Sequence, residues 1–141
     1  MKPNYKILDG INIQWPWSEL IVTGKKRVET RSYRLPERLY GVEIAIIETP
    51  GKQGLKEAGI SKARIIGTVI FEKSYLYKNK EHWLTEERIH LVSSDDSLYG
   101  FQKNKEKWAW VVGRVKKLDK PVPPPPKRGI IFAKNCKVPS K

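Results

Sequence analysis

The sequence is poor in the residues that cross-link small proteins. It contains a single cysteine, Cys136, and only two histidines, His82 and His90. One cysteine cannot form an intramolecular disulfide, and these three side chains cannot supply the four ligands of a closed structural zinc site. The sequence therefore excludes a disulfide scaffold and a zinc finger, and we predict no metal and no cofactor.

Long apolar runs are also missing. No stretch approaches the roughly 18 uninterrupted apolar residues of a membrane-spanning helix. The first ten residues include Lys2, Lys6 and Asp9 and lack the apolar centre of a signal peptide. We therefore expect a soluble, cytoplasmic protein. With 141 residues, 39% of them hydrophobic, the chain can still bury a sizeable core, and we expect a single domain over residues 1–141.

Acidic residues are scarce relative to basic ones. The chain has 28 Lys and Arg against 15 Asp and Glu, which gives a formal net charge of +13. Residues 114–141 alone carry a net charge of +8. This excess is more than solubility requires, so a polyanion is the natural partner. Nucleic acid is favoured over a membrane, because no basic amphipathic helix with a clean apolar face is present.

The pattern of apolar residues and breakers predicts a mixed fold. Strands are expected at 7–13, 27–31, 42–48, 63–71, 108–115 and 129–133, and helices at 16–23, 54–58 and 80–91. Gly67 indicates a bulge or sharp bend, as barrel strands need. These elements predict a small α+β domain on a curved or barrel sheet and disfavour a Rossmann-type domain.

Prolines gather late in the chain, at Pro121 and in the run Pro123–Pro126. Proline cannot donate a ladder hydrogen bond. We therefore expect a basic, proline-rich connection at 119–128 that is extended on the surface and leads into the last strand. Docking of a protein partner on this segment is the weaker alternative.

Aromatic and ionisable residues are concentrated between positions 15 and 32. The helix expected there ends at Gly24, a residue suited to the left-handed conformation that follows a last turn. In the strand that follows, Glu29 and Arg31 lie on one face. Together with Lys26 they can share one cleft, which is either an ion-pair network between helix and strand or a site for a polar base or a phosphate.

Two functions are open for this cleft. As a binding module, the basic side chains would contact phosphates, Trp17 would stack on a base, and Glu29 would accept hydrogen bonds from the base edge or orient Arg31. As a hydrolase, Lys26 assisted by Glu29 would activate water. The catalytic candidates are thus Lys26 and Glu29. The candidate binding residues are Trp17, Gly24, Lys26, Glu29, Arg31, Ser32, Lys127 and Arg128.

The other aromatic and imidazole side chains are expected to be structural. Trp108 and Trp110 alternate in one strand, so they point to the same face and should pack in the core. His82 and His90 have no carboxylate or cysteine pattern around them that completes a ligand set, and we expect both on the surface.

One spaced pattern, G-x-K-x-x-E-x-R, is formed by Gly24, Lys26, Glu29 and Arg31 and follows a Pro-Trp pair and an apolar helix. Farther along come a glycine-containing strand at 65–69, Trp-Ala-Trp-Val at 108–111, Pro-Val-Pro at 121–123 and a late glycine at 129. Together these features resemble the ASCH (activating signal cointegrator homology) domain family over nearly the whole chain.

The resemblance implies a PUA-like fold, a small β-barrel flanked by short helices, with a positively charged cleft for RNA or modified nucleosides. Some small bacterial relatives look like amidohydrolases of acetylated cytidine or like ribonucleases, which implies the hydrolase alternative. Lys26 matches the candidate catalytic base of the amidohydrolase-like branch. Glu29 stands where that branch has threonine, and Trp15 stands where many relatives have glutamine, with Gln14 one position earlier.

Overall fold

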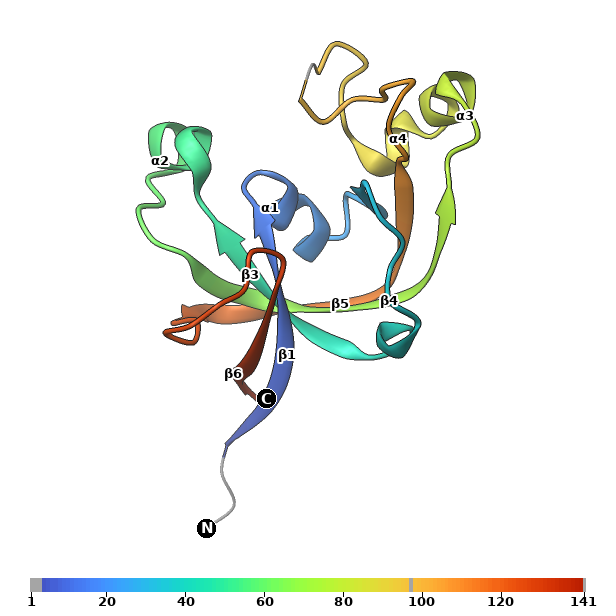
Figure 1. The fold of residues 1–141 in the computed structure, drawn as a ribbon. Helices are drawn as coiled ribbons and strands as arrows, with labels where there is room; N and C mark the ends of the chain where they lie inside the picture. Colours follow the sequence, from blue (N-terminus) through green and yellow to red (C-terminus); the bar gives the residue numbers. More distant parts are fainter. Residues whose placement is uncertain (1–3, 97, 141) are drawn as a thin grey trace.

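The computed structural model describes residues 4–96 and 98–140, which form one curved sheet with short helices around it (Figure 1). The six strands lie in the order β2-β5-β4-β3-β1-β6. They are β1 (Tyr5–Gln14), β2 (Val28–Arg31), β3 (Glu43–Thr49), β4 (Arg64–Leu76), β5 (Trp108–Val122) and β6 (Phe132–Pro139). The helices are α1 (Trp17–Val22), the 3-10 helix η1 (Glu37–Leu39), α2 (Gly51–Ala58), α3 (Lys80–Thr85) and α4 (Glu87–His90).

The sheet is mixed, and the predicted α+β class is confirmed. β1 pairs in parallel with β3, and the other pairings are antiparallel. β2 and β6 are the two edges in the strand order. Within the described residues no strand pairing joins these edges, so the sheet is open and a closed barrel is not confirmed.

Strands β4 and β5 are longer than the sequence pattern indicates. β4 and β5 pair from Ile65 with Val122 to Leu76 with Trp108. β5 thus continues four residues into the segment expected as a proline-rich connection. Because β2 pairs only with residues 108–111 of β5, the rest of β5 behaves as an edge strand, where proline is tolerated. The connection to β6 therefore spans residues 123–131.

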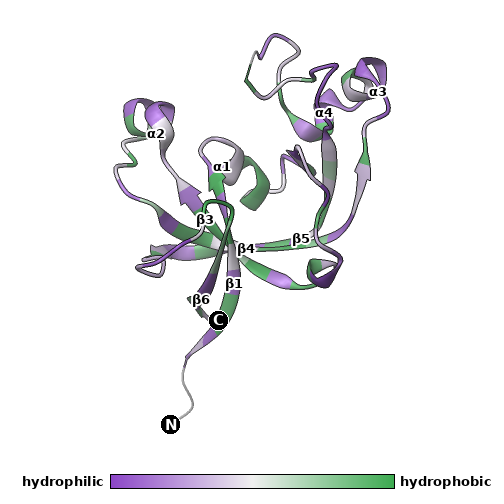
Figure 2. Cartoon of the chain, viewed as in Figure 1, coloured by the Kyte–Doolittle hydropathy of each residue, from purple (hydrophilic) through white to green (hydrophobic). Residues whose placement is uncertain are grey.

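Helix α1 lies in the hollow of the curved sheet. Its residues Ile21 and Val22 are buried in the largest hydrophobic cluster, together with side chains of β1, β3, β4 and β5. Figure 2 shows apolar residues along the strands that pass beneath α1. Trp110 is fully buried in this cluster and Trp108 packs against it, which confirms that these tryptophans belong to the core. No helix within residues 4–96 and 98–140 is long and apolar enough to cross a membrane.

A buried carboxylate fixes α1 to the sheet. Glu48, near the end of β3, is almost completely buried. Its Oε2 accepts a hydrogen bond from Ser18 Oγ at 2.7 Å, and its Oε1 accepts one from Arg64 Nε at 2.9 Å. A buried charge is tolerated when it is paired and hydrogen-bonded. These bonds set the start of α1, and hence the position of the residues that follow it.

Gly67 lies at an irregularity of the sheet, as expected. Ile46 and Ile47 are consecutive on β3, yet they pair with Gly67 and Ile65 of β4, so β4 carries one extra residue there. A Cβ atom at Gly67 would lie 2.3 Å from the carbonyl oxygen of Lys116 and 2.5 Å from a methyl carbon of Val22. The glycine therefore permits a close approach of β5 and α1 to β4.

We expect Gly67→Ala to lower the free energy of unfolding by about 1 to 3 kcal/mol, because backbone and core atoms must move to admit the methyl group. The measurement is the urea midpoint. Gly113→Ala is the matched control. Its Cβ would lie 2.5 Å from Cγ of Glu72, an exposed side chain that can swing away, so its midpoint should stay close to wild type. Equal midpoints for Gly67→Ala and wild type would contradict the steric argument.

Candidate functional site

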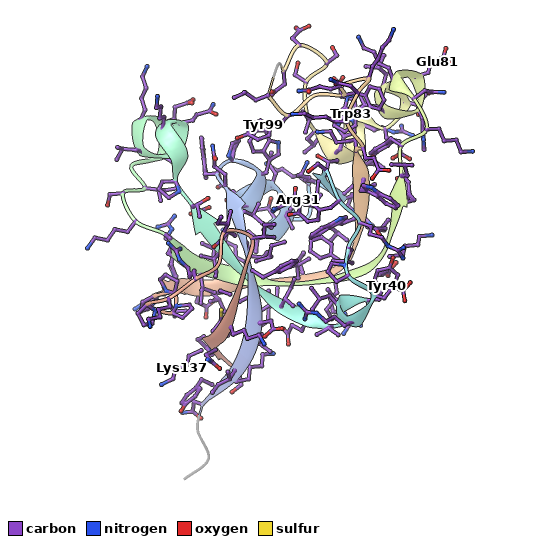
Figure 3. All side chains as sticks on the ribbon, viewed as in Figure 1. Arg31, Tyr40, Glu81, Trp83, Tyr99 and Lys137 are labelled. Carbon is purple, nitrogen blue, oxygen red and sulfur yellow. The ribbon has the colours of Figure 1, made fainter. Side chains whose placement is uncertain are left out.

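A cavity of about 950 Å³ opens beside α1. Its lining comes from β1, α1, β2, the end of β3, the loop between α4 and β5, and residues 128–130 before β6. Arg31 and Tyr99, labelled in Figure 3, both contribute to this lining. Segments far apart in the sequence therefore meet around one space, and most of the candidate residues named above lie on its wall.

Arg31 is the most connected side chain of the cavity. Its Nε and Nη2 donate to Glu29 Oε2 at 3.1 and 2.9 Å, and Nη2 also donates to the main-chain oxygen of Asn12 at 2.9 Å. Its Nη1 donates to Tyr33 Oη at 3.2 Å. The predicted same-face placement of Glu29 and Arg31 is thus confirmed. Burial lowers the pKa of Arg31, but Glu29 and Tyr33 outweigh it and hold that pKa above its ordinary value.

Lys26 takes a different position from its partners in the pattern. Its side chain is fully buried, does not line the cavity, and donates from Nζ to the main-chain oxygen of His90. Desolvation by burial lowers the pKa of Lys26 to about 8, against the opposing effect of the Glu29 carboxylate. Neighbouring cations, Lys107 and Arg31, lower this pKa further. The structure therefore places this amine behind the cavity wall.

His90 is buried, so its predicted surface position is wrong. Its ring stacks on Trp83 with centroids 3.7 Å apart. Nδ1 accepts from the main-chain N–H of Val92 at 3.0 Å, which leaves Nε2 to donate to the main-chain oxygen of Trp83 at 2.9 Å. Burial lowers the pKa of His90. Because a neutral imidazole with both nitrogens bonded can be buried at little cost, this residue tolerates the core.

The remaining candidate residues divide into two groups. Trp17, Ser32 and Arg128 line the cavity with Glu29 and Arg31. Gly24 and Lys127 do not. Gly24 has a φ of +83° at the end of α1, as expected of a residue after a last turn. Lys127 lines a second cavity along the proline-rich segment.

Several residues of the wall were not among those predicted from the sequence. Tyr99 contacts Trp17 edge to face, with ring centroids 4.5 Å apart. Lys107 donates from Nζ to the main-chain oxygen of Tyr99 at 2.9 Å and lies 5.4 Å from the ring centre of Trp83. Asn12 and Lys105 also line the cavity. Lys107 could have been found from strand pairing. If the strand at 27–31 pairs with the strand at 108–115, Lys107, which precedes Trp108, comes close to Arg31.

The wall combines three kinds of group. The basic side chains are Arg31, Lys105, Lys107 and Arg128. The acidic ones are Glu29 and Glu106, and Trp17 and Tyr99 supply aromatic surface. Such a wall can hold an anion beside a flat, hydrogen-bonding ring. In the part of the chain that the structure describes, no three His, Cys, Asp or Glu side chains are grouped to hold a metal ion.

Comparison with known proteins gives one family and one fold. A family model for the ASCH domain matches residues 11–122. The solved structure of ASCH from Zymomonas mobilis is similar, with a TM-score of 0.61 and 20% identity over 82% of this chain and 72% of that one. A tyrosine-to-phenylalanine variant of that protein matches with a TM-score of 0.61 and 21% identity, over 82% and 74% of the two chains. No curated protein matches.

The buried amine predicts a pH dependence of stability. Since the pKa of Lys26 falls from 10.5 to about 8 on folding, the unfolded chain binds more protons between these values, and stability rises with pH across that window. Across the whole window, the free energy of unfolding changes by about 3 kcal/mol. Between pH 7 and pH 10, the free energy of unfolding of wild type should therefore rise by about 2 kcal/mol relative to that of Lys26→Met. Urea unfolding curves of both proteins at several pH values measure this difference. If the unfolding free energies of the two proteins differ by the same amount at every pH, the ammonium of Lys26 is not desolvated.

Proposed function

The chain belongs to the ASCH domain family, and on that premise we propose that it binds RNA through the cavity beside β2. The family has a PUA-like fold and a proposed role in RNA binding. The observation that carries the proposal is the composition of the cavity wall, where aromatic and basic side chains surround the Glu29–Arg31 pair. The proposed ligand is a single-stranded segment with one unpaired base in the cavity.

The size of the cavity suits a single nucleotide. Its volume of about 950 Å³ is at the upper end of the range for small-ligand sites, roughly 300 to 1,000 Å³. A nucleotide in this space would lie against Trp17 and Tyr99, whose rings already contact each other. Trp17 is partly buried and packs against two hydrophobic clusters. A ring held in this way gives a base a rigid surface at little entropic cost.

The charge of the wall supports phosphate contacts. Arg31 is already bonded to Glu29, Tyr33 and Asn12, so its role is to order the wall. Lys105 and Arg128 are exposed basic residues of the lining, and they are the proposed phosphate ligands. Each phosphate contact releases condensed counterions, which makes the affinity fall as salt rises.

We expect Arg128→Ala to weaken binding of single-stranded RNA and to reduce the slope of log affinity against log salt by about 0.7. Fluorescence anisotropy with labelled RNA at several salt concentrations measures both. Arg114→Ala is the matched control, because it removes the same charge from an exposed position of β5 outside the cavity. The control should bind as wild type does. An equal loss in both variants would mean that net charge alone attracts the RNA, and no binding by wild type would overturn the proposal.

A hydrolase acting on RNA or on an acetylated cytidine is the second candidate. One observation favours it: burial lowers the pKa of Lys26 to about 8, close to the value that suits a general base at neutral pH. In the structure its Nζ donates to the main-chain oxygen of His90. To activate water, the side chain would have to leave this bond and enter the cavity.

If Lys26 is a general base, turnover of acetylated cytidine or RNA should rise with pH around a midpoint of about 8 and vanish in Lys26→Met. The variant must first give a cooperative urea transition. Lys116→Met serves as the control, since it removes an exposed ammonium of β5 outside the cavity that is not among the groups shifting the pKa of Lys26. Turnover that persists in folded Lys26→Met would exclude Lys26 as the base, whatever its rate in wild type.

A further inference from the structure

We propose that the cavity selects bases that carry an exocyclic amino group, namely cytosine, adenine and guanine, over uracil and hypoxanthine. This inference rests on the proposed function, because it concerns the same cavity and names the class of base that enters it. It follows from an excess of hydrogen-bond acceptors over free donors among the most buried groups of the wall.

Glu29 supplies the first acceptor. Its side chain is only 7% exposed, and it lines the cavity. Both hydrogen bonds from Arg31 go to Oε2, and Oε1 accepts none from the described residues. A carboxylate has lone pairs on both oxygens, so half of its accepting capacity is unused. A buried charged acceptor in this state is stabilised by any donor that reaches it.

Asn12 supplies the second acceptor. Its Nδ2 donates to the main-chain oxygens of Gly129 and Ile130 at 2.9 and 3.0 Å. These two bonds fix the orientation of the amide, because only the nitrogen can donate. Its Oδ1 is buried and has no hydrogen-bond partner among the residues described. Asn12 also lines the cavity, but this oxygen has almost no accessible surface in the structure, so a ligand would reach it only after a small movement of the wall.

The guanidinium of Arg31, which lies beside these acceptors, is mostly bonded to other groups of the protein. Four of the five N–H bonds of Arg31 donate within the protein, to Glu29, Tyr33 and the main chain of Asn12. Glu29 Oε1 and Asn12 Oδ1 therefore accept no hydrogen bond from the described residues. A ligand group that carries N–H bonds fits this arrangement, and a carbonyl oxygen facing Glu29 is repelled by it.

The amino group is what separates the bases chemically. The exocyclic nitrogens of cytosine, adenine and guanine each carry two N–H bonds. Uracil and hypoxanthine also carry one ring N–H, but uracil has a carbonyl oxygen where cytosine has its amino group, and hypoxanthine lacks the amino group of guanine. They therefore offer the carboxylate only that single N–H, without the two N–H bonds of an amino group. Carboxylates accept from the amino group of cytosine in other protein–nucleic acid contacts. The base would lie against Trp17 and Tyr99 as proposed above, and the exposed apolar side chains of Leu98 and Ile130 also line the cavity.

The test compares nucleotides that differ in this group. Unlabelled CMP and UMP form one matched pair, and GMP and IMP form another, each competing with a labelled single-stranded RNA for the full chain. Within each pair the phosphate and ribose are identical, so only the base edge differs. We expect the amino-bearing member to compete about tenfold more strongly or better in both pairs.

Glu29→Gln assigns the preference to this side chain. A glutamine amide can donate as well as accept, so the two members of each pair should converge to within about threefold. Glu106→Gln is the control, because it neutralises a second carboxylate that lines the cavity but is exposed. It should keep the wild-type preference. If Glu29→Gln does not fold, the competition experiment with wild type alone decides whether the cavity selects bases with an amino group.

The outcomes separate the inference from its premise. RNA binding with equal competition inside both pairs would overturn the base selection and leave the proposed function intact. A preference that survives in folded Glu29→Gln would overturn the role of Glu29. Wild type that binds neither RNA nor any nucleotide would overturn the proposed function, and the base selection with it.

Discussion

The hydrogen bonds of Arg31 span the open side of the sheet. Arg31 lies on β2, one edge of the strand order, and donates to the main chain of Asn12 on β1, which is separated from β2 by three strands of the sheet. This contact is possible only because the sheet curls until its two sides approach. Glu29 neutralises the charge that the contact buries. The bridge ties β2 to β1 across the hollow of the sheet, and both of its residues line the cavity.

The buried amine of Lys26 supports the cavity from behind. It bonds to the last residue of α4, His90, where main-chain oxygens have no partner inside the helix. The main-chain N–H of Arg27 bonds to the carbonyl of Ile89 in the same turn. α4 is thereby tied to the residues that precede β2. The loop after α4 carries Tyr99 and Lys107, so an amine outside the cavity anchors the start of a segment that forms part of its wall.

Local patterns predicted the parts of the site that lie within one strand or one turn. Alternation along 27–31 was enough to pair Glu29 with Arg31, and the glycine after α1 was recognised from its position. Spacing could not show that the chain turns Lys26 inward two residues before β2 begins, because packing against His90 decides it. Tyr99 reaches Trp17 across more than half the chain, and only strand pairing brings such residues together.

The cavity draws its wall from Asn12 to Ile130, nearly the full length of the described chain. The segment at 128–130 is held by the amide of Asn12 and by the start of β6 on β1. During synthesis β1 can pair with β3 once β3 has emerged, and only its other edge waits for β6. The wall of the cavity is therefore completed only when β6 and the segment before it join the sheet. A nascent chain that ends before β6 would thus have most of its sheet and no finished ligand pocket.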